Sequence, residues 1–297
     1  MEAKLYARLY QMVFAMPHSP RRAREQFCDR WVTMVYLWSV LHDRAMSWAC
    51  DVRNWPGDLL DRPLISQSRL SRRLRTVGVT QLIERLLSGA SDLFGTPPPL
   101  VKALDSKPLT VGAYSKDPDA AKGRLADGVF GKGYRLHAIM HGRNVRHWTL
   151  LPLNQHDSIG AAKLLPRLEG GGYLLADNAY DSNDCHAAAA QANHQLVAPP
   201  RACNKDVRDV KHNLPQRLRA LDMLHSPLPR AAQTGFGPAL YNTRQRIESG
   251  FGGLTFSGLG ALPPWVRRPR RVALWTAGKL LIFLCRNALK RTYRVNA

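Results

Sequence analysis

The chain has 297 residues, enough for two domains of ordinary size, and its 45% apolar and 22% charged residues are typical of a soluble globular protein. Lys and Arg number 43 against 22 Asp and Glu, so the formal net charge is +21. This excess indicates a polyanionic partner, with nucleic acid first; a merely basic soluble protein or a membrane-surface binder is the alternative. Five scattered cysteines without a C-x-x-C pair argue against a disulfide framework or a zinc site and favour a reducing compartment.

Residues 1–95 are predicted to be helical. A first helix is expected over residues 2–14, and Ser19-Pro20 is typical of an N-cap followed by the first helical position. The next helix carries an apolar stripe at three- and four-residue spacing, which we interpret as core packing and not as ligand stacking. The stripe consists of Phe27, Trp31, Val35, Trp38 and Leu41.

A basic helix is predicted around residues 65–75, with its leucines on one face and its arginines on another. Gly78 is expected to make a turn before a second short helix at 81–87. Two helices about a glycine suggest a helix-turn-helix that binds DNA ends, and a solvated basic face of a small bundle is the alternative. The candidate DNA-binding residues here are Arg69, Arg72, Arg73 and Arg75.

Three prolines at positions 97–99 mark the clearest boundary in the chain, because they exclude a helix and favour a stiff extended connector. After this linker, residues 96–99, the pattern predicts a mixed α/β region. Strands are expected at 100–104, 109–113, 132–141, 145–153, 173–177 and 195–198, with helices at 158–168 and 182–193. Residues 199–238 are expected to form loops and one short helix.

Two of the predicted strands end in an acidic residue, Asp105 and Asp177. Strand alternation places Asp177 on the same face as Tyr173 and Leu175. A carboxylate at the carboxyl end of a buried strand lies where open α/β sheets place their ligands, although such an Asp can simply cap the next helix.

A third acid, Glu248, lies on a predicted helix where Tyr241, Arg244 and Glu248 share one face at i, i+3 and i+7. Carboxylates from two strand ends and a helix suit a pair of Mg²⁺ ions, which take oxygen ligands. His137 and His141 are four residues apart on a strand, and we interpret them as hydrogen-bonded strand residues and not as zinc ligands.

The order Asp105, Asp177, Glu248 with these flanks resembles the catalytic core of bacterial insertion-sequence DDE transposases that carry a Tyr-x2-Arg-x3-Glu-x6-Lys signature. The Lys position of that signature holds Thr255, a departure at a phosphate-contacting position. The sequences at 132–137, 154–158 and 177–182 are also similar to motifs of this family. The resemblance covers roughly residues 98–260 and implies a ribonuclease-H-like mixed sheet flanked by helices. The helical pattern of residues 1–95 predicts that an all-α N-terminal DNA-binding domain precedes it.

The resemblance implies a transposase that binds the ends of its element and catalyses Mg²⁺-dependent cleavage and strand transfer. Two Mg²⁺ ions, for which Mn²⁺ is expected to substitute, would be bridged by Asp105, with Asp177 holding one and Glu248 the other. Arg244 suits a phosphate clamp and Tyr241 stacking or a hydroxyl contact, with packing as the alternative for both. The expected partners are double-stranded DNA, as terminal inverted repeats and target, and a second copy of the chain on paired ends.

From Ser249 to the end there is no acidic residue and there are nine basic ones. Within this segment, residues 261–297 are predicted to form a basic helical tail that contacts DNA phosphates. The apolar stretch 272–289 is interrupted by Lys279 and Arg286, so we predict a buried terminal helix and no membrane span. The densest basic cluster consists of Arg267, Arg268, Arg270 and Arg271.

The predicted organisation is therefore a helical DNA-binding or dimerisation region at 1–95, the linker, a catalytic domain at 100–260 and the tail. A cytoplasmic, nucleoid-associated bacterial protein is expected, because no secretory signal is evident at the first residues. Two other functions remain open: a ribonuclease-H-like nuclease without strand transfer, and a non-catalytic DNA-binding protein derived from a transposase.

Overall fold

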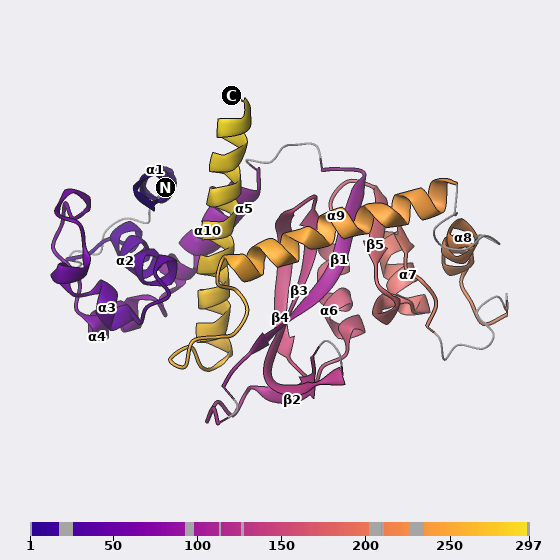
Figure 1. The fold of residues 1–297 in the computed structure, drawn as a ribbon, viewed down its shortest axis with the longest axis horizontal. Coiled ribbons are helices and arrows are strands. Elements are labelled where there is room, and N and C mark those ends of the chain that lie inside the picture. Colours follow the sequence, from indigo (N-terminus) through magenta and orange to yellow (C-terminus); the bar gives the residue numbers. More distant parts are fainter. Residues whose placement is uncertain are drawn as a thin grey trace. The chain divides into compact units, whose positions relative to one another are not determined.

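The chain folds into two compact units in a computed structural model (Figure 1). The helical unit comprises Met1–Phe94, Ser257–Leu259 and Pro263–Ala297, and the sheet unit comprises Gly95–Phe256 and Gly260–Leu262. The structure describes residues 2–17, 26–92, 98–112, 114–125, 128–201, 209, 211–225 and 235–295, without the side chains of 246–248 and 292–295. The predicted N-cap at Ser19 and residues 96 and 97 of the predicted linker therefore lie outside the described residues.

The described part of the helical unit contains helices and short 3-10 turns but no strand. The helices are α1 (Glu2–Ala15), α2 (Asp29–Leu41), α3 (Met46–Ala49), α4 (Gln67–Arg73), α5 (Val77–Asp92) and α10 (Pro269–Val295), with 3-10 turns at Val52–Asn54 and Gly57–Leu59.

Helix α2 is the centre of this unit. Every residue from Trp31 to Val40 is buried, so neighbours surround the helix and the predicted single stripe is too narrow a description. The aromatic side chains here are packing residues: the rings of Trp38 and Trp55 stack with their centroids 4.8 Å apart. Their indole N–H groups donate to backbone carbonyls of Asn54 and Ala49. These bonds satisfy the polar atoms that burial would otherwise leave unpaired.

The predicted turn at Gly78 is wrong. The turn lies at residues 74–76, and Gly78 stands in the first turn of α5. A Cβ atom at Gly78 would lie 2.4 Å from a carboxylate oxygen of Asp29, at the start of α2. The absence of a side chain at Gly78 therefore lets α5 lie close to the start of α2, and the glycine does not break the helix.

Helix α10 packs within the helical unit, although more than 170 residues separate it from α5 in sequence. By length and composition, Pro269–Arg291 could cross a membrane, yet 67% of its apolar window is buried inside the structure. Lys279 is buried and pairs with Asp43 at 2.6 Å. This burial is consistent with the core helix of a soluble protein, as the interrupted apolar pattern predicts.

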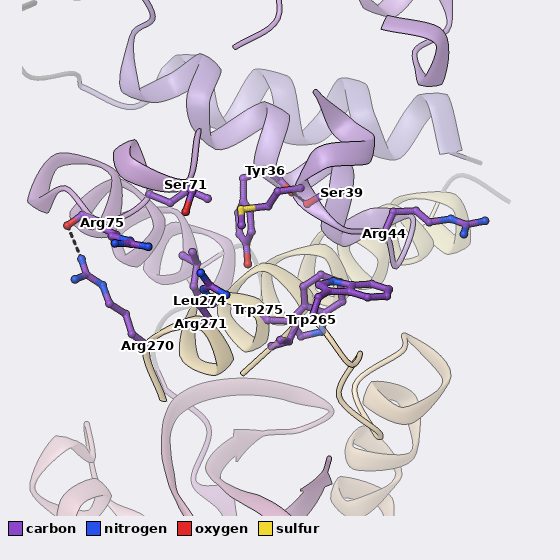
Figure 2. A pocket seen from close by; sticks show the side chains of 13 residues that line it. Tyr36, Ser39, Arg44, Ser71, Arg75, Trp265, Arg270, Arg271, Leu274 and Trp275 are labelled. Carbon is purple, nitrogen blue, oxygen red and sulfur yellow. Dashed lines mark hydrogen bonds between the residues drawn. The ribbon is translucent and has the colours of Figure 1, made fainter. Parts of the chain in front are cut away.

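A pocket opens in the helical unit, where the loop before α10 meets α2, α4 and their neighbours (Figure 2). Its interior is largely apolar, and arginines from two distant segments stand among its lining residues. The lining consists of Tyr36, Ser39, Arg44, Met46, Ser71, Leu74, Arg75, Trp265, Val266, Arg270, Arg271, Leu274 and Trp275.

The sheet unit has a six-stranded sheet and flanking helices. Its strands are β1 (Val101–Thr110), β2 (Ala121–Arg124), β3 (Phe130–His141), β4 (Asn144–Pro152), β5 (Gly172–Ala176) and β6 (His194–Val197). Its helices are α6 (Asp157–Leu164), α7 (Asn183–Gln191), α8 (Pro215–Leu224) and α9 (Phe236–Phe256), with 3-10 turns η4 (Leu165–Arg167) and η5 (Asn178–Tyr180).

The strands run in the order β2-β3-β1-β5-β6, and β4 also pairs with β3. β1, β3 and β4 are antiparallel neighbours, whereas β1, β5 and β6 are parallel. The predicted mixed α/β architecture is thus confirmed. The strand order is consistent with the ribonuclease-H-like arrangement that the sequence resemblance implies.

The first strand differs from its prediction. Two strands separated at Asp105 are expected, but β1 runs unbroken from Val101 to Thr110. The reason is β3, which pairs with β1 from Lys102 to Thr110 and so continues the strand past Asp105. Only the parallel partner β5 stops early, at the pair Leu104↔Ala176. Asp105 therefore lies in mid-strand, at the point where one of its two neighbours ends.

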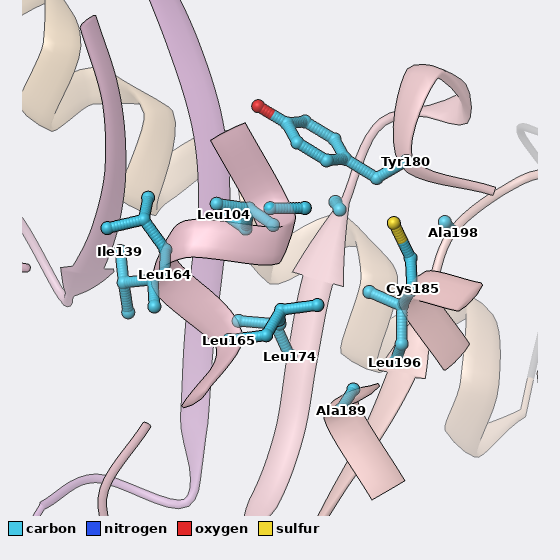
Figure 3. Close-up of a cluster of buried hydrophobic side chains, with 12 residues drawn as sticks. Leu104, Ile139, Leu164, Leu165, Leu174, Tyr180, Cys185, Ala189, Leu196 and Ala198 are labelled. Atoms are coloured by element: carbon cyan, nitrogen blue, oxygen red, sulfur yellow. The ribbon is translucent and has the colours of Figure 1, made fainter. Parts of the chain in front are cut away.

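The two faces of the sheet are covered differently. Leu104, Leu174 and Ala176 belong to a buried apolar cluster with residues of α6 and α7 (Figure 3). Helix α9 packs on β1, β3 and β5, and the ring of its Phe236 meets Tyr173 edge-on at 5.5 Å. Alternation along the strands turns Tyr173, Leu175 and Asp177 away from the apolar cluster and toward the α9 side.

Candidate active site

Asp105 and Asp177 occupy neighbouring positions on adjacent parallel strands. The last paired residues of β1 and β5 are Leu104 and Ala176, and each acid follows directly. Neighbouring strands lie roughly 4.8 Å apart, and both acids alternate away from the apolar cluster. The sheet therefore brings together two carboxylates that are 72 positions apart in the sequence.

Asp177 is also a cap. Its Oδ1 accepts a hydrogen bond from the backbone N–H of Ala179 at 2.9 Å and starts the turn η5. Asp177 therefore caps the turn that follows β5 and also lies beside Asp105, so the two roles offered by the sequence do not exclude each other. On Asp105, Oδ1 accepts from the backbone N–H of Ser106 at 2.8 Å.

Burial raises the pKa of Asp177 above its usual range, while the Ala179 N–H and the Arg244 guanidinium act in the opposite direction. Asp157 raises the pKa further. The ionised form of Asp177 is therefore less favoured than that of an exposed aspartate, and a nearby cation would offset this cost. Oxygen donors that are crowded and poorly solvated in this way fit a divalent metal ion, which relieves the repulsion between them.

Asp157, at the start of α6, is a third carboxylate near the two acids. Its carboxylate pairs with Arg135 on β3 at 3.2 Å and lies 3.6 Å from Nδ1 of His137. The cap of α6 is the neighbouring His156, whose side chain accepts from the N–H of Ser158. Sequence reasoning missed the proximity of Asp157 to the site because nothing in the spacing indicates that α6 packs against β3 and the turn η5.

Tyr180 is a buried residue close to His137 and to the three carboxylates. Its buried hydroxyl lies 3.3 Å from Nδ1 of His137. Burial raises the pKa of Tyr180, and the charges of Asp157, Asp105 and Asp177 raise it further, so the phenol stays protonated. Burial lowers the pKa of His137 to about 4. Both side chains are therefore neutral near pH 7 and leave the negative charge on the acids.

Helix α9 is attached to the end of β5 through its signature residues. The hydroxyl of Tyr241 donates to the carbonyl oxygen of Ala176 at 3.1 Å, and Nη1 of Arg244 donates to the Tyr241 oxygen at 3.2 Å. These two hydrogen bonds hold the guanidinium of Arg244 close to Asp177. Glu248 is on the same helix, one turn beyond Arg244, and its side chain lies outside the described residues.

The side chains that the structure describes contain no cluster of three His, Cys, Asp or Glu residues arranged as a metal site. Of the three predicted ligands, Asp105 and Asp177 are brought together, and the helix that carries Glu248 packs over the same strands. His137 and His141 both stand on β3, the strand predicted to carry them; Nδ1 of His137 lies 3.3 Å from the Tyr180 hydroxyl, whereas Nε2 of His141 has no hydrogen-bond partner among the described residues.

A buried ion pair supports the segment that follows Asp177. Asp181 accepts two hydrogen bonds from Arg217 on α8, at 2.8 and 2.6 Å, and lies 3.3 Å from His186. Ser182 caps α7 by accepting from the N–H of Cys185. The role of Arg217 was not predicted, because its partner lies 36 residues away and across a loop.

The predicted DNA-binding arginines of α4 differ from one another. Arg73 is half-buried and bonds Asp29 at 2.6 Å and the carbonyl oxygen of Phe27 at 2.9 Å. Arg69 donates to the side chain of Gln26 at 2.9 Å on the surface. Arg72 and Arg75 are exposed. Arg73 is thus committed to holding α4 against the start of α2.

Arg75 and the C-terminal arginines line one pocket (Figure 2). Arg270 donates to the backbone carbonyl of Arg75, which joins two basic clusters 195 residues apart. Arg44 and Arg271 stand at the same pocket beside Trp265, whose surface is 41% exposed. Cationic groups next to an accessible aromatic ring are a common surface for nucleic acid.

A family model described as "Transposase DDE domain" matches residues 96–283, more than half of the chain. The chain is a member of the DDE transposase family. The matched region of this DDE transposase includes both paired acids and all of α9, and it extends into α10.

A search of curated proteins found no match to the transposase. Among solved structures, a piggyBac transposase synaptic complex with hairpin DNA is similar at 10% identity and a TM-score of 0.49, covering 97% of this chain and 73% of that one. A Mos1 transposase paired-end complex with the left transposon end is similar at 13% identity and a TM-score of 0.23, covering 84% and 83%.

Proposed function

We propose that this DDE transposase binds the ends of a mobile element and cuts and joins DNA at a site formed by Asp105, Asp177 and Glu248. The observation that carries the proposal is the register of β1 and β5, which places two of these acids side by side. The strand order and the helix that carries the third acid support a ribonuclease-H-like catalytic unit.

The chemistry of the donor set suits magnesium, with manganese as a substitute. Asp105 would bridge two ions, with Asp177 holding one and Glu248 the other. When bound, the ions supply Lewis-acid stabilisation at the phosphorus and lower the pKa of the attacking water. Arg244 stands beside Asp177 and would hold a phosphate oxygen of the DNA, while Tyr241 keeps that guanidinium in place through its hydroxyl.

The helical unit would supply much of the DNA affinity. Exposed guanidinium groups at Arg69 and Arg72 and around the pocket are suited to backbone phosphates, which position a duplex without reading its sequence. The tail arginines Arg267 and Arg268 extend the same basic segment. Because two ends of an element must be cut in concert, a homodimer on paired ends is the expected assembly, in the cytoplasm of a bacterium and at its nucleoid.

A single-turnover assay tests this function, using duplex DNA that carries the inverted repeats flanking the coding frame, with Mg²⁺ and a target duplex. Wild-type protein should release the ends and join them to the target. Asp105→Asn should abolish cleavage but leave binding intact, because it removes a metal ligand and no DNA contact. Cleavage without joined product would favour a plain nuclease, and binding without cleavage would favour a non-catalytic derivative.

A further inference from the structure

Lys107 is a cation near Asp105 and Asp177, and its hydrogen-bond partner is a hydroxyl group and not a carboxylate. It follows Asp105 by two positions on β1, so both side chains leave the same face of the strand. Its ammonium donates to the hydroxyl of Thr255 on α9 at 2.6 Å. In the part of the chain that the structure describes, no carboxylate forms an ion pair with Lys107.

Thr255 presents a lone pair to this ammonium. Its hydroxyl proton is directed to the carbonyl oxygen of Phe251 at 3.2 Å, so the oxygen is left to accept from Lys107. An ammonium carries three N–H donors, and a single hydroxyl satisfies one of them. The remaining donors are available to a ligand with several acceptor oxygens, and a phosphate has them.

The electrostatics favour an incoming anion. Lys107 is only partly exposed, and its ammonium is held at the strand by the Thr255 hydroxyl. A half-buried charge that is poorly solvated and lacks a carboxylate partner gains more from an anion than a surface lysine does, because the effective dielectric constant is lower.

The location suits the DNA backbone next to the reacting phosphate. Two residues along a strand advance roughly 7 Å, so Lys107 lies about that far from Asp105. A DNA strand carries one charge per roughly 3.4 Å of helix axis. Because the backbone winds around that axis, consecutive phosphates stand further apart than this rise, so a cation at this separation from Asp105 would meet a neighbouring phosphate. On α9, Thr255 is seven residues beyond Glu248, about two turns along the same face.

We propose that Lys107 and Thr255 form a phosphate-binding subsite that holds a backbone phosphate of the DNA adjacent to the one cut at Asp105 and Asp177. The signature position that would hold lysine is Thr255 in this chain, and the cation that meets it comes from β1. The inference rests on the proposed cleavage function and adds to it a residue that positions the substrate.

The test compares Lys107→Met, which removes the charge and keeps the stem, with Lys107→Arg and with Lys163→Met, a matched loss of one exposed lysine on α6. Lys107→Met should slow single-turnover cleavage on the order of 10- to 100-fold, as expected for one charge-assisted hydrogen bond. Lys107→Arg and Lys163→Met should stay near wild type. Thermal unfolding of Lys107→Met should be unchanged or slightly raised.

Two further experiments distinguish two roles of Lys107: binding a DNA phosphate, or only holding α9 against β1 through its bond to Thr255 (a structural clamp). Exchange of the two side chains, Lys107→Thr with Thr255→Lys, should recover most of the lost rate, since the charge returns to the same place. A neutral methylphosphonate at the neighbouring DNA position should slow the wild type but not slow Lys107→Met further, because the two changes remove one interaction.

The proposal is overturned if wild-type protein cleaves and Lys107→Met cleaves equally fast. It is also overturned if the exchange recovers nothing and the methylphosphonate effect adds fully to that of Lys107→Met, which is the behaviour of a clamp. If wild-type protein binds but does not cut, the proposed function fails by itself. The methylphosphonate comparison is then made on affinity, where additivity again rejects the subsite.

Discussion

The hydroxyl of Tyr241 donates a hydrogen bond to the carbonyl oxygen of Ala176, the last residue of β5, at 3.1 Å. Asp177 is the next residue in the chain, so this bond couples the position of α9 to the position of the acid. Arg244 rests on the same hydroxyl at 3.2 Å. These two bonds therefore attach α9 to the end of β5, where Asp177 stands.

Tyr241→Phe tests this coupling, because it removes the hydroxyl and keeps the ring. The loss of one hydrogen bond should lower the free energy of unfolding by about 0.5–1.5 kcal/mol. The cleavage rate should fall by more than that loss alone explains, since Arg244 loses its support beside Asp177. Denaturant unfolding and single-turnover cleavage measure the two effects; an unchanged rate would show that Arg244 is held by other contacts.

Asp177→Asn should stabilise the protein while it abolishes cleavage. Burial raises the pKa of Asp177, so the folded state binds its proton more tightly than the unfolded state. The resulting destabilisation is present at neutral pH and is relieved as the pH falls through the raised pKa. A neutral amide removes it at every pH. In metal-free buffer the variant should therefore melt higher than wild type, and added Mg²⁺ should raise its melting temperature less.

Acid should destabilise the sheet unit through His137, which faces Asp157, Arg135 and Tyr180. Its pKa is lowered from 6.5 to about 4, chiefly by burial. Between these values the unfolded state binds a proton that the folded state does not, so stability is lost as the pH falls. The slope is up to about 1.4 kcal/mol per pH unit. Unfolding of His137→Gln should depend less on pH, whereas the exposed His225→Gln should match wild type.

The arginines of the helical unit should separate into two classes. Arg73→Ala should lower the free energy of unfolding by about 1–3 kcal/mol, because it breaks a half-buried charge-assisted bond to Asp29. Its slope of log affinity against log salt should stay near that of wild type. A change in slope with unchanged stability would place Arg73 on the DNA instead.

Arg75→Ala and Arg270→Ala should affect DNA binding alike, because both residues line the same pocket. Each should reduce the salt slope by up to about 0.9 for the phosphate it contacts. Arg75→Ala should leave the melting temperature unchanged, whereas Arg270→Ala also loses its hydrogen bond to the Arg75 carbonyl and should melt slightly lower. The two losses in slope should appear on element ends and on unrelated DNA equally. A loss confined to element ends would indicate base contacts by this surface.

The sequence by itself determined the character of the elements and the identity of the candidate acids. Alternation over 173–177 and the 3.6-residue period of the Tyr241 helix depend on neighbours close in the chain. The structure places Tyr173 against α9 and brings Tyr241 and Arg244 together, as these periods predict. The same local patterns predicted a mixed α/β region and a buried terminal helix. The residues around Asp177 and Glu248 resemble the sequence motifs of DDE transposases, so the sequence also predicts the chemistry of that family.

Tertiary structure decided which distant residues meet. β1 continues through Asp105 because β3 pairs with it there, and that pairing is invisible to a local pattern. The same is true of Arg75 with Arg270 and of Lys107 with Thr255, which are 195 and 148 residues apart. Such contacts depend on how strands register and helices pack. A sequence can therefore indicate an acid, an arginine or a lysine, but only the packed fold determines which charge each of them faces.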